Sequence, residues 1–322
     1  MLWVGKLRTK LLMNNRFNSW ILALRPRTLF LAVATALCGS SIAYSTGTFS
    51  ISICILTILT ATILQLMSNL ANDLGDFQHG TDTTGERVGP QRAVQSGAIS
   101  PSKMRKAILV TVILAVITGL GLIYEASQFM PVIIILLFIA LGSASIIAAI
   151  KYTAGKNPYG YRGLGDIFSF VFFGPVSVVG TYFLHTHQFN FQPWLPAIGL
   201  GLFTIAVLNI NNMRDMENDR KSKKITVAIK LGFKNAKYYH MLLTICGIAC
   251  FLTYNVLYTS LWLQNLYVLI FLFFLKILYD IFKINENKKL DPYLRYTSMT
   301  TFLLVVCFSI CINANSILMQ TT

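Results

Sequence analysis

Two short motifs rich in Asp and Asn each lie at the end of a long apolar run. In the first motif Asn72 and Asp76 are four residues apart, and in the second Asn211 and Asp215 repeat this spacing. On an α-helix, residues four apart lie on the same face, about one turn from each other. The acidic residues of the two motifs are Asp73, Asp76 and Asp82 in the first, and Asp215, Glu217 and Asp219 in the second. The spacing therefore predicts two matched polar helix faces.

Clustered carboxylates at the rim of a bilayer repel each other and are costly unless a partner neutralises them. A hard divalent cation bound by Asp and Asn oxygens is such a partner. Mg²⁺ in particular uses one or two carboxylates and completes its shell with water and substrate phosphate. The two motifs therefore predict Mg²⁺ that bridges a diphosphate.

Basic residues near the motifs are candidates for the remaining phosphate charge. They are Arg87, Arg92, Lys151, Arg162, Arg214, Arg220 and Lys224. A simpler interpretation is that the acids are solvated loop charges paired with these neighbours. Two matched motifs at equivalent helix ends favour a shared site instead.

The rest of the chain predicts the elements that hold these residues. Of its 322 residues, 55% are hydrophobic and only 12% are charged, about half the charged share of a globular protein. This composition excludes a secreted disulfide scaffold, a disordered tail protein and most cytosolic enzymes. Long uncharged stretches predict an all-α, polytopic membrane bundle of nine helices. Their expected spans are 20–44, 51–72, 106–125, 130–151, 165–184, 193–213, 237–257, 262–283 and 295–317.

The distribution of charge predicts the orientation of the bundle. With nine crossings, all 27 Lys and Arg residues fall on one side, with the N-terminal tail and alternate loops. Because basic residues mark the cytoplasmic side, the N-terminus is predicted to be cytoplasmic and the C-terminus to lie on the outer side. The positive charge thus serves as an orientation signal, so no nucleic-acid partner is expected, and no protein partner is implied. We expect a cytoplasmic tail over 1–19 and a single transmembrane domain over 20–322.

The placement of the motifs predicts internal symmetry. They end helices that are four crossings apart, and both helices run toward the cytoplasm. Such an arrangement is typical of two repeated halves that face a central cavity. A membrane transporter shares this pattern, but its carboxylates should lie near mid-bilayer rather than at helix ends.

At these residues the sequence resembles the UbiA-type intramembrane prenyltransferases, and within them the 1,4-dihydroxy-2-naphthoate polyprenyltransferases. The resemblance covers residues from about 20 to 235. The segments that carry it are Arg25–Thr28, Asn72–Asp82, Gly89–Gly97, Tyr152–Asp166, Phe172–Gly174, Gly180–Tyr182 and Asn211–Thr226. Two positions depart from the family pattern: Lys223-Lys224-Ile225-Thr226 replaces the usual Gly-Lys-Arg-Thr, and Asp166 stands where Glu is common.

This resemblance implies a Mg²⁺-dependent enzyme of a bacterial inner membrane. It would transfer a polyprenyl group from polyprenyl diphosphate to 1,4-dihydroxy-2-naphthoate, with loss of CO₂ and diphosphate, giving a demethylmenaquinone. The implied catalytic acids are Asp73, Asp76, Asp215 and Asp219. The implied metal ligands are Asn72, Asp76, Asn211, Asp215 and Asp219. The implied substrate-binding residues are Arg92, Lys151, Tyr152, Arg162, Arg214 and Lys224.

The resemblance constrains the identity of the aromatic acceptor least, because a related prenyltransferase could act on another aromatic ring. The loop from Asn157 to Arg162 lies on the same side as both motifs. We therefore expect this loop to cap the cavity, with Tyr rings stacking on the acceptor and Arg162 pairing with its carboxylate. Alternatively, Pro158 and Gly160 only shape a turn there.

Overall fold

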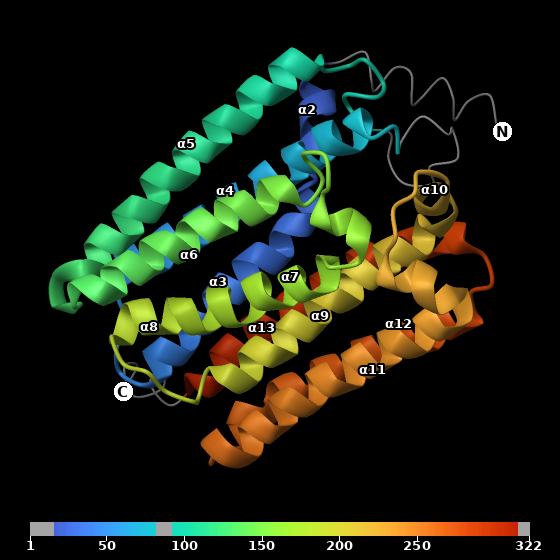
Figure 1. Cartoon of the computed structure of the whole chain (residues 1–322). Coiled ribbons are helices and arrows are strands. Elements are labelled where there is room, and N and C mark those ends of the chain that lie inside the picture. Colours follow the sequence, from blue (N-terminus) through green and yellow to red (C-terminus); the bar gives the residue numbers. More distant parts are fainter. Residues whose placement is uncertain (1–15, 82–91, 315–322) are drawn as a thin grey trace.

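The computed structural model describes residues 16–81 and 92–314, and its elements in this part of the chain are all helical (Figure 1). Nine helices there are long and apolar enough to cross a membrane, as predicted. In chain order the elements are α2 (Arg16–Leu24), η1 (Pro26–Thr28), α3 (Leu29–Ser45), α4 (Ile51–Gln78), α5 (Pro101–Ala126), η2 (Ser127–Phe129), α6 (Val132–Lys151), η3 (Tyr159–Arg162), α7 (Gly165–Val171), η4 (Phe172–Val179), α8 (Gly180–Thr186), α9 (Trp194–Arg214), α10 (Met216–Lys221), α11 (Val227–Tyr258), η5 (Trp262–Ile270), α12 (Phe271–Lys283), η6 (Asn287–Leu290) and α13 (Asp291–Ile312).

Hydrogen-bonding side chains mark where several of these helices begin. The hydroxyls of Ser50, Ser100 and Thr226 accept hydrogen bonds from the backbone N–H groups three residues later, at the starts of α4, α5 and α11. These contacts satisfy N–H groups that have no partner within a helix. In lipid every other backbone group must also be bonded internally, so uninterrupted helices are the stable form of the apolar runs.

Two predicted helix ends differ from the structure by more than five residues. The helix predicted over 51–72 continues to Gln78, so the first motif lies inside the last turns of α4. The helix predicted over 237–257 begins ten residues earlier, at Val227, with a break at Gly232, whose φ is 76°. Glycine adopts this left-handed conformation without the steric cost that a side chain adds. The prediction ended each helix where the apolar run ended. Because both extensions contain polar residues, it did not include them.

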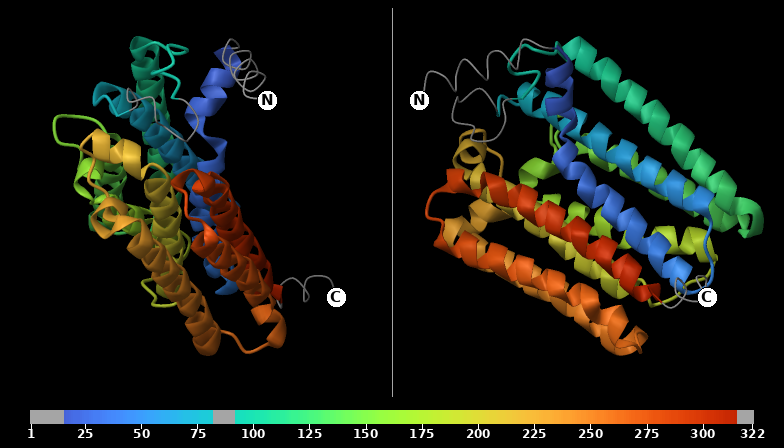
Figure 2. Two further views of the ribbon diagram at one scale, coloured as in Figure 1. Left: turned by 90° about the vertical axis from the view of Figure 1, so that its right-hand side faces the viewer. Right: turned by 180° about the vertical axis from the view of Figure 1, so that it is seen from behind.

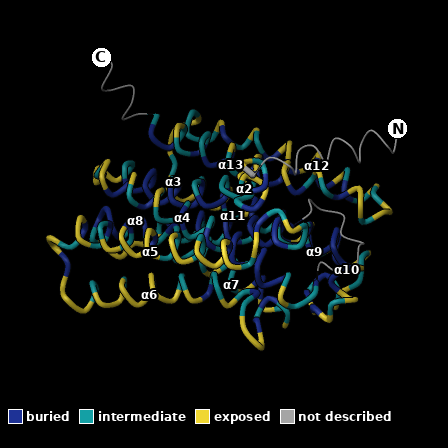
Figure 3. The backbone as a smooth tube through the Cα atoms, turned by 90° about the horizontal axis from the view of Figure 1, so that it is seen from above, coloured by how far each residue is buried: buried dark blue, intermediate teal, exposed yellow. Residues whose placement is uncertain are grey.

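The helices differ greatly in how deeply they are buried. Of the apolar window in α9, 67% is buried within the protein, whereas the share is 11% for α5 and 6% for α6. Figure 3 shows the exposed backbone of α5 and α6 along one side of the bundle. The α9 helix packs against α11, α13 and the segment from α7 to η4. It is therefore the central helix, and α6 lies at the edge.

The fifth crossing is not a regular helix. It runs through α7, η4 and α8, and η4 is a π-helical segment that contains Pro175. Proline removes a backbone donor within a helix, and π segments are frequent at functional sites. This crossing packs closely on α9, because a Cβ added at Gly174 would lie 2.6 Å from the Ala197 carbonyl oxygen.

The helices that carry the two motifs, α4 and α9, end on the same side of the bundle. In both views of Figure 2 the end of α4 and the short helix α10 lie toward the same end as α2, and the last turns of α13 lie at the other. This arrangement agrees with an odd number of crossings. The described residues begin at Arg16, so only the last four residues of the predicted tail 1–19 are seen, in α2.

Candidate active site

A cavity of about 380 Å³ runs along the inside of the bundle and receives residues from both motifs. At its polar end it is lined by Asn72, Asp76, Arg92, Tyr152, Asn211 and Lys224. Along α4 the lining continues from Asp76 back to Thr57, a length of about 28 Å at 1.5 Å per residue. The walls beyond the polar end are mainly aliphatic and aromatic, with Phe168 and Phe172 among them. The cavity is therefore a long apolar channel with a charged head.

Asp76 is held at this head by two side chains from other parts of the chain. It is buried, and its Oδ2 accepts a hydrogen bond from the guanidinium of Arg92. Its Oδ1 accepts one from the hydroxyl of Tyr161 at 2.9 Å. Burial, followed by the charge of Asp76, raises the pKa of Tyr161 above its ordinary value, so the hydroxyl stays protonated and donates. Three segments thus converge on one carboxylate.

Asn72 lies one turn before Asp76, and a residue just after α6 holds its side chain in place. The Thr153 hydroxyl, just after α6, lies 3.1 Å from both Oδ1 of Asn72 and the carbonyl oxygen of Ala71. The close approach depends on Gly75, where an added Cβ would lie 2.4 Å from the Thr153 hydroxyl oxygen. The first motif and the end of α6 are therefore packed as one unit.

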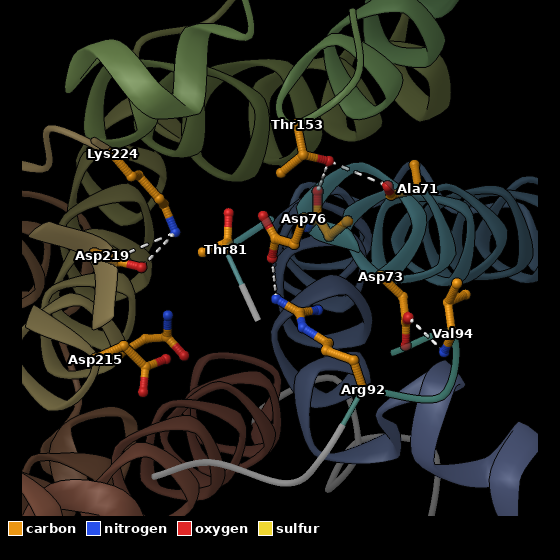
Figure 4. Close-up of polar contacts among 12 residues, drawn as sticks. Ala71, Asp73, Asp76, Thr81, Arg92, Val94, Thr153, Asp215, Asp219 and Lys224 are labelled. Carbon is orange, nitrogen blue, oxygen red and sulfur yellow. Dashed lines mark hydrogen bonds and ion pairs between the residues drawn. The ribbon is translucent and has the colours of Figure 1, made fainter. Parts of the chain in front are cut away.

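Asp73, which was expected to be a catalytic acid, does not line the cavity. Its carboxylate accepts hydrogen bonds from the backbone N–H groups of Ala93 and Val94 at 3.0 and 3.1 Å. In Figure 4 its side chain points away from the gap between the motifs and toward Val94. Residues three apart on a helix lie on broadly the same side, so the hydrogen bonds to Ala93 and Val94, and not the spacing, account for the different direction of the Asp73 carboxylate. It positions the segment that carries Arg92.

Asp219 and Lys224 form the second half of the charged head. Both are buried, and Nζ of Lys224 lies 3.3 Å from Oδ2 of Asp219. Burial raises the pKa of Asp219 to about 6, although the Lys224 charge acts in the opposite direction. Burial alone would lower the pKa of Lys224, but the charges of Asp219 and Asp76 raise it. The lysine therefore remains charged beside both motifs, with its Nζ 5.7 Å from the centre of the Tyr161 ring.

Arg214 is bound to protein groups and does not line the cavity. Its guanidinium donates to both carboxylate oxygens of Asp215, at 2.9 and 2.6 Å. It also donates to Oδ1 of Asp291 at 2.6 Å and to Oδ1 of Asn211 at 2.8 Å. These bonds join the end of α9 to the start of α13. Arg214, which was expected to bind substrate, thus contacts Asp215, Asn211 and Asp291 and lies outside the cavity lining.

Lys151 and Arg162, two expected substrate-binding residues, are exposed and lie outside the cavity lining. Arg162 follows Tyr161 in the short helix η3, where successive side chains leave in different directions. Tyr161 points toward Asp76, so its neighbour points outward. Tyr152, between these segments, does line the cavity, and burial raises its pKa. Arg220, another expected cation, is exposed on α10 and also lies outside the cavity lining. Arg87 and Asp82 lie outside the described residues.

Several polar residues of the lining were not singled out from the sequence. Gln65 and Asn69 precede Asp76 on the same face of α4 and are joined by a hydrogen bond of 3.1 Å. Asn69 also donates to the carbonyl oxygen of Leu24 at 2.9 Å, next to Arg25, which has a φ of 49°. Polar residues inside a membrane helix are themselves a signal of function, and this signal was available in the sequence for both Gln65 and Asn69.

The charged residues of the head lie on the two sides of a gap. Figure 4 shows Asp76 and Arg92 on one side, and Asp215, Asp219 and Lys224 on the other. Within the described residues, no three His, Cys, Asp or Glu side chains come together as a metal cluster. Oδ2 of Asp219 is buried and lacks a hydrogen-bond donor with suitable geometry. A buried, incompletely bonded carboxylate oxygen of this kind is a suitable ligand for a cation.

Comparisons with known proteins agree with this architecture. The sequence profile of the UbiA prenyltransferase family matches residues 32–313. A 1,4-dihydroxy-2-naphthoate octaprenyltransferase of Haemophilus influenzae is 38% identical over 309 residues, which are 94% of this chain and 98% of that protein. The protein of the same name from Escherichia coli is 42% identical over 241 residues, 75% of this chain and 77% of that one.

Solved structures share the fold. A UbiA homolog from Archaeoglobus fulgidus, bound to GPP and Mg²⁺, has a TM-score of 0.61 at 13% identity, covering 90% of this chain and 99% of that one. The apo UbiA homolog from Aeropyrum pernix also has a TM-score of 0.61, at 16% identity, covering 91% and 98%. The described residues contain nine helices able to cross a membrane, and residues of both motifs line one cavity. Together with the sequence matches, this shows that the chain belongs to the UbiA prenyltransferase family.

Proposed function

We propose that this protein transfers a polyprenyl group from polyprenyl diphosphate to 1,4-dihydroxy-2-naphthoate, releasing diphosphate and CO₂. The product is the quinol form of a demethylmenaquinone. The observation that carries the proposal is that Asn72 and Asp76 of the first motif and Asn211 of the second line the head of one long apolar cavity. Asp219 lies beside this head through its ion pair with the lining residue Lys224. Relatives that are 38% and 42% identical bear the name of this activity.

The charged head suits a diphosphate that arrives with a divalent metal. In the described structure the carboxylates of Asp76, Asp215 and Asp219 are each paired with a cation. A diphosphate adds several negative charges that these pairs do not neutralise. The metal-binding set proposed is Asp76, Asp215 and Asp219, with Asn72 and Asn211 as neutral oxygen donors. Such a set, with one or two carboxylates per ion and substrate oxygens completing the shell, suits Mg²⁺.

Mg²⁺ would supply Lewis-acid stabilisation of the charge that develops on the leaving diphosphate. Arg92 and Lys224 lie where they would share this charge, because both line the cavity head. Charge-assisted hydrogen bonds from such donors are strongest in a site from which water is excluded. The exposed Lys151 and Arg162 have no part in this scheme.

The reaction balances without a further reactant. The C–O bond to diphosphate breaks and its electron pair leaves with the diphosphate, which forms an allylic cation. The naphthoate carbon that bears the carboxylate attacks this cation, and a C–C bond forms. The C–C bond to the carboxylate then breaks, CO₂ leaves, and the electron pair restores the aromatic ring. Apolar walls such as Phe168 and Phe172 protect the cation from water.

The protein is a multi-pass membrane protein. We propose further that it lies in the inner membrane of a bacterium with its N-terminus in the cytoplasm and its C-terminus on the outer side. The segregation of all 27 basic residues supports this orientation. It places the charged head on the side where Mg²⁺ and soluble naphthoate are available. The stretch 20–322 forms a single domain in this proposal.

A direct assay with three aromatic acids identifies the acceptor. Purified protein is incubated with Mg²⁺, octaprenyl diphosphate and, separately, carboxyl-labelled dihydroxynaphthoate, 4-hydroxybenzoate or homogentisate. We expect a prenylated quinol and an equal amount of labelled CO₂ with the naphthoate alone, and neither product when EDTA replaces Mg²⁺. Product with a different acceptor and none with the naphthoate would overturn the proposed substrate but retain prenyl transfer.

A further inference from the structure

A second groove, separate from the cavity of the charged head, lies between α12 and α13. Lys276 and Asp280 of α12 and Arg295 of α13 line one part of it, and Phe273 and Met299 line another. Both helices belong to candidate membrane spans. Figure 2 shows them, in orange and red, on the side of the bundle opposite to α5. Because Phe273, Lys276, Arg295 and Met299 are exposed, the groove faces the bilayer and not the protein interior.

The lining of the groove changes from charged to apolar with depth in the membrane. Asp291, at the start of α13, accepts a hydrogen bond from the guanidinium of the second motif, so α12 ends and α13 begins on the side of the charged head. Counted from these helix ends, Lys276 and Arg295 lie about 10 and about 6 Å inside. Phe273 and Met299 lie deeper, at about 15 and about 12 Å. A phospholipid has the same order, with a phosphate next to its acyl chains.

Arg295 holds a positive charge at this depth, and no carboxylate of the described residues forms an ion pair with it. Asp291, one turn before it, pairs instead with Arg214 at 2.6 Å and with Arg27 at 3.8 Å. Nε of Arg295 donates to Sδ of Met299 at 3.4 Å, so the guanidinium is directed along the groove, away from the start of α13. Sulfur is a weak acceptor, and an arginine has four further N–H donors. A cation at this depth is costly unless an anion pairs with it.

The charges that line the groove suit one negative charge. Nζ of Lys276 lies 2.5 Å from Oδ1 of Asp280, so these two charges compensate each other. Arg295 adds one further positive charge. A phosphodiester group carries a single negative charge, and its oxygens accept two parallel hydrogen bonds from a guanidinium. A zwitterionic headgroup would also bring an ammonium group near Lys276, and the two cations would repel each other.

We propose that this groove binds one anionic phospholipid, with its phosphodiester at Arg295 and an acyl chain over Phe273 and Met299. Basic pockets between membrane helices are suited to anionic lipid headgroups. Arg295 is adjacent to Leu294, which lines the cavity of the charged head. The bound lipid therefore contacts the same turn of α13 that bounds this cavity. The inference does not depend on the reaction proposed above.

The test measures lipid binding to the full chain in detergent, without substrates. Phosphatidylglycerol or phosphatidylcholine with the same acyl chains is titrated, and native mass spectrometry gives the affinity of the first lipid bound. We expect phosphatidylglycerol to bind about fivefold more tightly than phosphatidylcholine, and Arg295→Gln to lose this preference. Arg295→Lys keeps the charge and should retain most of it. Unchanged phosphatidylcholine binding and an unchanged thermal midpoint show that the variants are folded.

Arg105→Gln is the matched control. Arg105 is exposed and lies four residues after Pro101, the first residue of α5, just as Arg295 lies four residues after the first residue of α13. It is part of another candidate membrane span and does not line the groove. We expect the preference for phosphatidylglycerol to be unchanged in Arg105→Gln, because the groove and not the charge alone makes the site.

Three results would overturn the inference. The first is an unsubstituted protein without a preference for phosphatidylglycerol, and the second is an equal loss in Arg105→Gln and Arg295→Gln, which would indicate only a general attraction of basic residues to anionic lipid. The third is a dimer that Arg295→Gln converts to a monomer, because a second copy of the chain would then occupy the groove. Inorganic phosphate should not displace phosphatidylglycerol, and displacement would indicate a site for a soluble anion instead.

Discussion

The hydroxyl of Tyr161 donates a hydrogen bond to Oδ1 of Asp76 over 2.9 Å and so joins the segment after α6 to the end of α4. The same residue accepts a backbone hydrogen bond from Ile225 at 3.0 Å, next to Lys224. One tyrosine therefore contacts both halves of the charged head. It orients the first-motif carboxylate relative to the cation of the second motif.

Removal of this hydroxyl tests that relationship. In Tyr161→Phe we expect KM for prenyl diphosphate to rise by about tenfold, because a hydrogen bond to a charged group contributes about 1.5–3 kcal/mol. The thermal midpoint should change little, since the ring contacts remain. Tyr238→Phe, at an exposed tyrosine on α11, serves as the control. A KM equal to that of the control would show that Tyr161 does not orient Asp76 for substrate.

Asp76→Asn should reduce kcat/KM by about a hundredfold or more, because it removes a charge at the place where the leaving group is stabilised. Asp215→Asn and Asp219→Asn are expected to behave alike. The comparison variant is Asp280→Asn, at an acid paired with Lys276 outside the cavity. Near-normal turnover in any two of the three motif variants at saturating Mg²⁺ would contradict the metal site.

Asp73→Asn should affect stability more than chemistry. Its carboxylate accepts two backbone hydrogen bonds that hold the segment bearing Arg92. We expect a loss of about 1–3 kcal/mol in the free energy of unfolding, seen as a lower thermal midpoint in detergent. Residual turnover should exceed that of Asp76→Asn. If both variants are equally inactive and equally stable, Asp73 acts in the chemistry as first expected.

Arg162→Ala should leave KM for both substrates within about twofold of normal, because an exposed side chain outside the cavity contributes little to a buried site. Arg92→Ala should in contrast raise KM for prenyl diphosphate, since Arg92 lines the charged head. A selective rise in KM for the naphthoate in Arg162→Ala would show that η3 closes over the acceptor.

The orientation in the membrane is tested with reporter fusions. Alkaline phosphatase fused after Thr322 should be active, and a fluorescent protein fused before Met1 should be fluorescent, because the first is expected outside and the second in the cytoplasm. A phosphatase fusion after Lys223, in the predicted cytoplasmic loop, should be inactive. Termini on one side would mean that the number of crossings is even.

The sequence by itself determined the fold class, the nine candidate membrane helices found in the described residues, and the matched spacing of Asn72–Asp76 and Asn211–Asp215. These features are local, since hydropathy over about 20 residues and a period of 3.6 residues need no information about distant contacts. The same reasoning missed the start of α11, because Lys and Asn residues after Val227 interrupt its apolar pattern.

Only the tertiary structure decided which way each polar side chain points. Sequence spacing treats Asp73 and Asp76 as equivalent, yet one holds a backbone segment and the other lines the cavity. Tyr161 and Arg162 are adjacent, yet only Tyr161 points inward. These directions follow from how α4, α6 and η3 pack together, and those contacts join residues about 80 positions apart. Helical periodicity fixes which residues share a face, and packing between helices decides which face the cavity receives.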